Sequence, residues 1–418
     1  MGLNTTASRP KSRVSEDLVS VARRSDEAVP SHPTFKALQE ADHARLALRP
    51  VTPTTENYPG EGTVDIVEFE QKLGRLLNID PKHIVTYTSG MTALEYLVES
   101  AAPTMGTVIL HSNDEYSGTN RYLGGILPKR GVKSILITDD TTSMEVLREK
   151  IEANRPDIIV LETVANGPNM PVVDLDAFFS IKVLKEIDPL IVFDNTLATP
   201  TNIHPSSIIG RRGFRTAVVE SGMKAYSRNS EMFGVVFTED EELLTTLRGE
   251  RITRRGNLSV EQGKALNRRL VNQTREEFDA INRTTARNAL ELAKACQEAQ
   301  GDGKVFTVWH PNLSTHPNST YANLHFPNGA TPLFFIQTTD PYKVAGPRGR
   351  SRDEIARVLE ANDMINNYVD KGHSFAKKRT TVFPDRDSEV IRISAGVEGP
   401  GEIRELKEAL RESLSTIA

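Results

Sequence analysis

The runs IIVLE (158–162), LIVFDNT (190–196) and AVVESGMK (217–224) decide the fold. Each run is continuously apolar at first and then ends in polar or charged residues. Continuous apolar runs, in contrast to alternating ones, are typical of strands that are buried on both faces of a parallel sheet. We therefore expect a mostly parallel sheet whose strands end in polar side chains.

Similar short runs lie on both sides of these three, and helical stretches separate them. Alternation of this kind is typical of the α/β class. The chain from residue 251 to 300 is predicted to be helical and charged, and a second α/β portion follows it. Further strands are expected at 84–88, 108–111, 134–138, 235–238, 333–337 and 390–394.

We divide the chain into three predicted parts. Residues 1–60 are polar and contain many prolines, which indicates an N-terminal arm. Residues 61–260 form the predicted large domain, and residues 261–418 form a smaller C-terminal domain that includes a linking helix. The final helix is expected after the Gly399-Pro400-Gly401 break, where a stripe of Leu and Ile begins.

The bulk composition excludes several classes of function. A net charge of −5 over 418 residues gives no basic surface for nucleic acid or an anionic membrane. The single cysteine, Cys296, excludes an internal disulfide framework and is expected to be buried. No apolar run approaches the roughly 18 residues that a membrane span needs, and the N-terminus lacks a secretory hydrophobic region, so we expect a cytoplasmic protein.

Common motifs for other cofactors are missing from the sequence. No metal-binding H-E-x-x-H, no G-x-G-x-x-G after the first strand and no phosphate-binding G-x-x-x-x-G-K-[ST] occur. No G-x-S-x-G nucleophile motif occurs either. Metal-dependent, nicotinamide-dependent and nucleoside-triphosphate-dependent mechanisms therefore lack support.

The chemically informative residues lie where the predicted strands end. Asp194 ends one strand, Ser221 and Lys224 follow another, and Ser89-Gly90-Met91 stands at a strand-to-helix junction. Each has an ordinary structural explanation when taken alone, as a helix cap, a turn or a solvated lysine. Together they match what a pyridine cofactor needs, because such a cofactor requires a lysine, an anion for the ring nitrogen and a phosphate cradle.

Eight motifs, in order along the chain, resemble the Cys/Met-metabolism family of pyridoxal-5′-phosphate (PLP) enzymes. This family includes cystathionine γ-synthase, the cystathionine lyases and methionine γ-lyase. The motifs are SGM (89–91), DEYSGT with Tyr116, ETVANGP (162–168), FDNTLATP (193–200), SGMK (221–224), HPNLSTHPN (310–318), GHSFA with Ser374 and RISAGVEG (392–399). The resemblance implies an α/β fold of the fold type I, aspartate-aminotransferase-like class.

The resemblance also implies a role for each residue around the cofactor ring. Lys224 would form the Schiff base with PLP and later move protons. Asp194 would pair with the pyridinium nitrogen, and Tyr116 would stack on the ring and assist the leaving group. Asn166 would contact the 3′-oxygen of the cofactor or the substrate carboxylate.

Other residues are implied at the phosphate and at the substrate. The backbone amides of Gly90 and Met91 and the hydroxyl of Ser221 would hold the phosphate. Arg392 would bind the α-carboxylate of an amino-acid substrate, because its planar guanidinium suits a carboxylate. Ser374 would orient that carboxylate or Lys224.

Three departures from the family pattern concern the edge of the site. Met223 precedes the lysine where the family usually has a threonine, and Glu220 adds an anion next to the serine. The family segment that reaches the neighbouring subunit's phosphate is shortened here to YPGEGT (58–63) and lacks its arginine. The resemblance implies a homodimer or homotetramer with its active site at the subunit interface, and we expect Tyr58 or Arg49 of the neighbouring chain to complete the phosphate site.

Three hypotheses on function remain open. The first is γ-elimination or γ-replacement on an amino acid that bears a γ leaving group, with a non-standard amino acid of a specialised pathway as the substrate in view. The second is an ordinary sulfur-amino-acid β- or γ-lyase. The third is a catalytically idle homologue that acts as a binding or scaffold subunit; the joint presence of Lys224, Asp194 and Arg392 argues against it.

Overall fold

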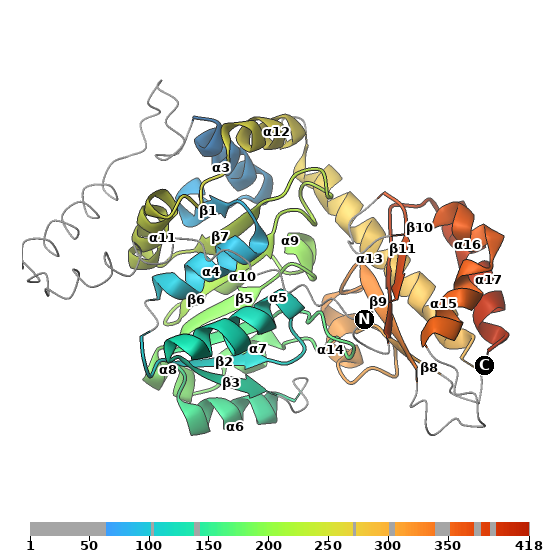
Figure 1. Cartoon of the computed structure of the whole chain (residues 1–418), viewed down its shortest axis with the longest axis horizontal. Coiled ribbons are helices and arrows are strands. Elements are labelled where there is room, and N and C mark those ends of the chain that lie inside the picture. The colour runs from blue at the N-terminus through green and yellow to red at the C-terminus, as the bar shows by residue number, and fades with distance from the viewer. Residues whose placement is uncertain are drawn as a thin grey trace, which may run out of the picture. The chain divides into compact units, whose positions relative to one another are not determined.

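A computed structural model describes residues 64–101, 104–137, 143–270, 273–300, 306–338, 352–371, 378–384 and 390–417. Its first sheet has seven strands in the order β1-β7-β6-β5-β4-β2-β3 (Figure 1). The strands are β1 (Ile84–Tyr87), β2 (Val108–Ser112), β3 (Lys133–Ile137), β4 (Ile158–Glu162), β5 (Leu190–Asp194), β6 (Arg215–Ser221) and β7 (Gly234–Thr238).

The central strands of this sheet are parallel. β3, β2, β4, β5 and β6 pair in parallel, whereas β7 runs antiparallel to both of its neighbours, β6 and β1. The prediction of a mostly parallel sheet is confirmed, and the observed strand ends differ from the predicted ones by at most two residues.

Helices surround the first sheet (Figure 1). In the sequence they precede, separate and follow its strands. They are α3 (Val64–Leu77), α4 (Gly90–Ser100), α5 (Ser117–Asn120), α6 (Met144–Asn154), α7 (Leu175–Phe179), α8 (Val183–Ile187), α9 (Thr199–Asn202), α10 (Ser206–Ile209), α11 (Glu241–Thr253), α12 (Val260–Leu270) and α13 (Arg275–Glu298). Short 3-10 turns lie at Pro81–His83 and Leu127–Arg130, and a π-helical turn, η2, spans Arg121–Ile126.

The first sheet is buried on both faces, because successive side chains of a strand point to opposite sides. Val192 and Val219 belong to one apolar cluster, together with residues of α4 and α11. Phe193 and Val218, their neighbours in sequence, belong to another cluster, together with residues of α3 and α7. This packing explains the continuous apolar runs of the sequence, and it leaves the strand ends as the place for polar side chains.

The second sheet belongs to the C-terminal part of the chain and is mainly antiparallel. Its strands β8 (Phe306–Trp309), β9 (Leu333–Thr338), β10 (Asp370–Lys371), β11 (Thr381–Pro384) and β12 (Val390–Ser394) lie in the order β10-β11-β12-β9-β8. Only β10 and β11 pair in parallel. The remaining helices are α14 (Ser319–His325), α15 (Arg352–Glu360), α16 (Asp363–Tyr368) and α17 (Pro400–Ser415).

α13 and α17 pack on the second sheet and enclose its core. Cys296 of α13 is fully buried there, as expected, and burial raises the pKa of its thiol. α17 begins at Pro400, within the predicted break, because proline is well tolerated in the first turn of a helix. In the described part of the chain, no helix is both long and apolar enough to span a membrane. The predicted division at residue 260 stays a prediction.

Candidate active site

The start of α4 lies against the end of β6. Ser89 caps this helix, since its Oγ accepts the N–H of Thr92 at 3.0 Å. A Cβ atom on Gly90 would lie 2.9 Å from the Cβ of Ser221, so glycine permits this close approach. Amides in the first turn of a helix have no acceptor within the helix and favour an anion. The structure thus brings together Gly90, Met91 and Ser221, and phosphate binding by them stays a prediction.

The carboxyl ends of β4, β5 and β6 form the floor of the site. Glu162 of β4 is the register partner of Asp194 of β5. Asp194 Oδ1 accepts the N–H of Thr196 at 2.9 Å, and Thr196 Oγ1 accepts the N–H of Ser221 at 2.9 Å. Thr196 therefore links the carboxylate of β5 to the serine of β6.

Burial dominates the electrostatics of Asp194. It raises the pKa of the carboxyl group, while the hydrogen bonds from Thr196 lower it. A carboxylate removed from water needs a cationic partner to stay ionised. A protonated ring nitrogen would be such a partner, so the position suits the predicted pairing with a pyridinium.

Lys224 follows the end of β6 by one turn. The backbone N–H of Lys224 donates to the backbone carbonyl of Ser221 at 3.1 Å. Burial, and then the positive charge of Arg392, lower the pKa of the Lys224 amine to about 8. Arg392 belongs to β12 of the second sheet, and its guanidinium carbon lies 5.6 Å from the ring centre of Phe383. Two predicted site residues from distant parts of the sequence are thus close enough to interact.

Tyr116 stands at the start of α5 with 46% of its surface exposed. A Cβ atom on Gly118 would lie 2.6 Å from Cε1 of Tyr116 and 3.1 Å from Sδ of Met91. The tyrosine ring and the methionine side chain therefore both border Gly118. Because the ring is exposed, a cofactor can stack on it.

Glu162 holds two site segments in place. Its Oε1 accepts the N–H of Tyr116 at 2.6 Å, and its Oε2 accepts the N–H of Asn166 at 2.6 Å. Burial and the nearby Asp194 raise the pKa of Glu162 well above its usual range. Sequence reasoning assigned no role to Glu162, although it ends a predicted strand and begins the quoted ETVANGP motif.

Asn166 carries an unsatisfied polar atom. Its side-chain oxygen, Oδ1, is buried and accepts no hydrogen bond from the described residues. Buried polar atoms are normally paired. An external donor at this position would satisfy the atom, which fits the prediction that Asn166 contacts the cofactor or the substrate.

The expectation for Glu220 is wrong. Its Oε1 accepts a hydrogen bond from Asn195 Nδ2 at 2.6 Å, and its Oε2 accepts one from the hydroxyl of Tyr226. Burial raises the pKa of Glu220 to about 8, so the group is mostly protonated at pH 7. Side chains alternate along a strand, and Glu220 faces away from the side of Ser221. It therefore adds no anion to the phosphate site.

Three predicted residues lie outside the described part of the chain. They are Tyr58 and Arg49, proposed for the neighbouring subunit's phosphate, and Ser374, proposed for the substrate carboxylate. Two further buried residues near the site, His111 and Glu115, were not anticipated: His111 ends a predicted strand, and Glu115 lies in the DEYSGT motif, where only Tyr116 had a predicted role.

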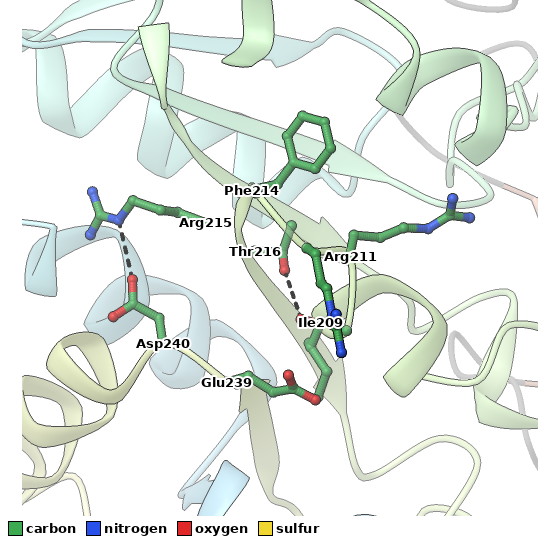
Figure 2. A pocket seen from close by; sticks show the side chains of 10 residues that line it. Ile209, Arg211, Phe214, Arg215, Thr216, Glu239 and Asp240 are labelled. Carbon is green, nitrogen blue, oxygen red and sulfur yellow. Dashed lines mark hydrogen bonds and ion pairs between the residues drawn. The ribbon is translucent and has the colours of Figure 1, made fainter. Parts of the chain in front are cut away.

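A separate cavity of about 270 Å³ opens at the other end of β6 (Figure 2). Arg215, the first residue of the strand, pairs there with Asp240 at 3.1 Å between Nε and Oδ2. In open parallel sheets ligands bind beyond the carboxyl ends of the strands. Lys224 and Asp194 lie at that carboxyl end, so this cavity is not the active site.

Comparison with known sequences decides the family. The profile described as Cys/Met metabolism PLP-dependent enzyme matches residues 39–414. The chain belongs to this family. It is therefore a PLP-dependent enzyme, and the resemblance seen in the sequence is confirmed.

Curated relatives of this PLP enzyme match it over part of their length. Cystathionine β-lyase of Saccharomyces cerevisiae is 23% identical over 198 residues, which cover 46% of this chain and 41% of the relative. Cystathionine γ-lyase of Bacillus subtilis is 27% identical over 240 residues, which cover 56% and 57%. 5-Aminolevulinate synthase of Rickettsia bellii is 29% identical over 154 residues, which cover 37% and 34%. The matched region thus spans between about a third and somewhat more than half of these relatives.

Solved structures share the fold over most of the chain. Cystathionine γ-synthase of Xanthomonas oryzae pv. oryzae, in complex with cystathionine, has a TM-score of 0.68 at 19% identity and covers 88% of this chain and 90% of its own. Cystathionine γ-lyase of Lactobacillus plantarum, complexed with L-serine, has a TM-score of 0.66 at 18% identity and covers 88% and 91%. The predicted fold type I class is confirmed.

The residues of this PLP enzyme fit its cofactor. The geometry places a half-buried lysine, a half-buried carboxylate, an exposed aromatic ring and a helix start at one end of the sheet. The unpaired Oδ1 of Asn166 adds an acceptor for a hydroxyl or an amine. Lys224, Asp194, Tyr116 and Ser221 thus suit the predicted roles at PLP, and their assignment stays a prediction.

Proposed function

We propose that this enzyme catalyses γ-elimination or γ-replacement on a non-standard amino acid that bears a leaving group on its γ carbon. The observation that carries the proposal is the pair Lys224 and Arg392. Burial and the charge of Arg392 lower the pKa of the lysine to about 8, so a substantial fraction of the amine is neutral near pH 7 to 8. A neutral amine next to a carboxylate-binding guanidinium can act as a base on the α carbon of an amino acid.

The roles of the chain's own groups follow from this arrangement. Arg392 binds the α-carboxylate, and this anchor holds the α C–H bond toward Lys224. The carboxylate of Asp194 favours a protonated pyridine nitrogen. PLP, when bound, supplies a sink for the electron pair that the departing α proton leaves behind.

The proton balance distinguishes γ chemistry from β chemistry. In γ-elimination Lys224 takes the α proton and then a β proton, and it later returns one proton to the γ carbon and one to the β carbon. The γ substituent leaves with its bonding electron pair, and Tyr116 protonates it. Water finally releases a 2-oxo acid and ammonia. In γ-replacement a nucleophile adds at the γ carbon instead.

The altered edge of the site supports a non-standard substrate. Met223 stands where a hydroxyl donor is usual, and the YPGEGT segment (58–63) lacks the arginine of the family pattern. The central groups Lys224, Asp194 and Arg392 are kept. A conserved reaction with a changed binding surface is the simplest account of this combination.

A panel of amino acids with leaving groups on the β or the γ carbon tests the proposal. The readout is 2-oxo acid release by the purified PLP-loaded enzyme, with Lys224→Ala as the inactive control. We expect release from substrates with a γ leaving group, and faster turnover for non-standard side chains than for cystathionine or methionine.

The alternative is an ordinary sulfur-amino-acid lyase, and the names of the yeast and Bacillus relatives favour it. Turnover that is fastest with cystathionine or methionine would support this alternative and overturn the proposed substrate class. Release from β-substituted amino acids alone would overturn the γ chemistry.

A further inference from the structure

Three hydrogen-bonded polar side chains, of which two are buried, begin at Glu115, the residue before Tyr116. Glu115 Oε1 lies 2.6 Å from His111 Nδ1, and His111 Nε2 lies 2.7 Å from the hydroxyl of Ser134. The side chains of Glu115 and His111 are both 0% exposed. These side chains run from the residue before Tyr116, through the end region of β2, to β3 at the edge of the sheet.

The π-helical turn η2 lies on one side of this group of hydrogen-bonded side chains. A Cβ atom on Gly124 of η2 would lie 3.6 Å from Cε1 of His111, so the turn passes close to the imidazole. π-Helical turns of this kind are frequent at functional sites. The second carboxyl oxygen of Glu115, Oε2, is buried and has no hydrogen-bond partner among the described residues.

Glu115 interacts electrostatically with two other carboxyl groups. Asp194 at the end of β5 raises the pKa of Glu115, and Glu115 in turn raises the pKa of Glu162 at the end of β4. Among the described residues, three ionisable groups interact electrostatically with Glu115 or contact it directly. They are Asp194, Glu162 and His111 of β2. Three ionised carboxylates here would repel one another strongly in a buried setting.

The protonation states of Glu115 and His111 avoid this repulsion. Burial, and to a lesser extent Asp194, raise the pKa of Glu115 to about 9, and burial lowers the pKa of His111 to about 4; backbone hydrogen bonding to Ser112 opposes both shifts and is the smaller effect. Between these values both groups are neutral. The carboxylic acid then donates to His111 Nδ1, and His111 Nε2–H donates to the Ser134 hydroxyl, so one direction of hydrogen bonding satisfies the chain.

We propose that Glu115 is a buried carboxylic acid that donates a hydrogen bond to His111, and that this pair positions Tyr116 while keeping a further negative charge away from Asp194. Glu115 is thus a positioning residue. It fixes the backbone before Tyr116, as Glu162 fixes the Tyr116 amide. The inference rests on the proposed roles of Tyr116 and Asp194 at the cofactor, but its first test does not depend on activity.

The first test measures the pH dependence of thermal stability in the PLP-loaded Glu115→Gln variant. An unfolded glutamate loses its proton near pH 4.3, whereas the folded group keeps it up to about pH 9. The parent therefore loses stability as the pH rises between these values, and the glutamine variant does not. We expect the Tm of the variant, relative to the parent, to rise by several degrees from pH 5 to pH 8.

The matched control is Glu408→Gln, at an exposed glutamate of α17, where no such difference should develop. A Tm difference at Glu115 that is flat or falls with pH would mean that the carboxyl is ionised in the folded state, and the proposal would be overturned. This outcome is independent of the substrate panel, so a failure here is distinguishable from a failure of the proposed reaction.

The second test separates positioning from simple packing. Glu115→Leu stays buried and apolar but leaves His111 Nδ1 without its partner, whereas Glu115→Gln still donates a hydrogen bond to that atom. We expect Glu115→Leu to shift the visible absorption and circular dichroism of bound PLP, and Glu115→Gln to restore them. An unchanged cofactor spectrum in a folded, PLP-loaded Glu115→Leu protein would overturn the positioning role.

Discussion

Asp194 and Lys224 carry opposite charges, and burial pushes both toward neutrality. It raises the pKa of the Asp194 carboxyl and lowers that of the Lys224 amine to about 8. The two shifts serve different ends. A less basic lysine is a better proton acceptor at neutral pH, since more of it is free of its proton, whereas the carboxylate regains its charge when a cationic ring nitrogen binds beside it.

Asp194→Asn isolates the charge of this residue. The amide keeps the shape of the side chain and still accepts the hydrogen bond from the Thr196 amide. It no longer offers an anion to the ring nitrogen, so we expect kcat to fall by at least a hundredfold while PLP is retained. Steady-state kinetics on the best substrate of the panel measure this, with PLP content determined in parallel. A variant nearly as fast as the parent would make Asp194 only a structural cap.

Arg392→Lys tests the recognition of the α-carboxylate. Lysine keeps the positive charge but loses the planar pair of donors that matches a carboxylate. Loss of a charge-assisted pair in a desolvated site costs about 2–5 kcal/mol, so kcat/KM should fall at least thirtyfold for every amino acid tested. Arg404→Lys, at an exposed position of α17, is the control and should change nothing. A loss confined to one substrate would place Arg392 at the side chain instead.

At the scale of elements, the start of α4 is the part most sensitive to added volume. Gly90→Ala would place a methyl group 2.9 Å from the Cβ of Ser221, where something has to move. Overpacking of this kind costs about 1–3 kcal/mol, and we expect the affinity for PLP to fall by about tenfold or more. Equilibrium titration of the apoenzyme with PLP measures it.

The control for this change is Gly249→Ala in α11, where no atom beyond the neighbouring helix backbone lies within 4 Å of the added carbon. Alanine favours helix over glycine by about 1 kcal/mol, so this variant should bind PLP normally and be at least as stable as the parent. Equal PLP affinity in the two variants would show that the start of α4 does not contact the cofactor.

The strands of the first sheet could be predicted because both of their faces are buried. β4 and β5 have the predicted bounds, since an uninterrupted run of Ile, Val and Leu leaves little choice. β8 was missed because only alternate residues face a core: Phe306 and Val308 are buried, while Thr307 and Trp309 are half-buried. β10, with two residues, is too short to give a pattern.

Site residues with a role in a sequence motif could be predicted. Contacts that depend on tertiary packing could not. Asp194 ends a predicted strand and Ser221 and Lys224 follow another, and the structure places them at the carboxyl ends of β5 and β6. Glu220 was misjudged, because its neighbours Asn195 and Tyr226 come together only in the folded chain. The bond between Glu115 and His111 is likewise set by how the chain turns after β2, which no local pattern indicates.

At the scale of the whole molecule, we expect a homodimer or homotetramer whose phosphate sites are completed across the interface. Bound phosphate carries about −1.5 to −2 charges, and Met223 removes one donor on the near side. We expect Arg49 or Tyr58 of the partner subunit to supply the missing donor. Light scattering gives the mass of the assembly.

Subunit mixing tests the shared site. Lys224→Ala and the double variant Arg49→Ala, Tyr58→Phe should each have low activity alone. Mixed oligomers should regain activity, because some sites then combine an intact lysine with an intact partner segment. No recovery, in mixtures shown by mass to contain both chains, would contradict a site shared between subunits.

The central claim is that Lys224 carries the cofactor at the carboxyl end of the first sheet. Borohydride reduction of the PLP-loaded enzyme fixes the pyridoxyl group to the lysine that holds it, and peptide mapping by mass spectrometry then locates that lysine. We predict the label on the peptide that contains Lys224 and no incorporation in Lys224→Ala. A label on any other lysine of the parent enzyme would contradict the account.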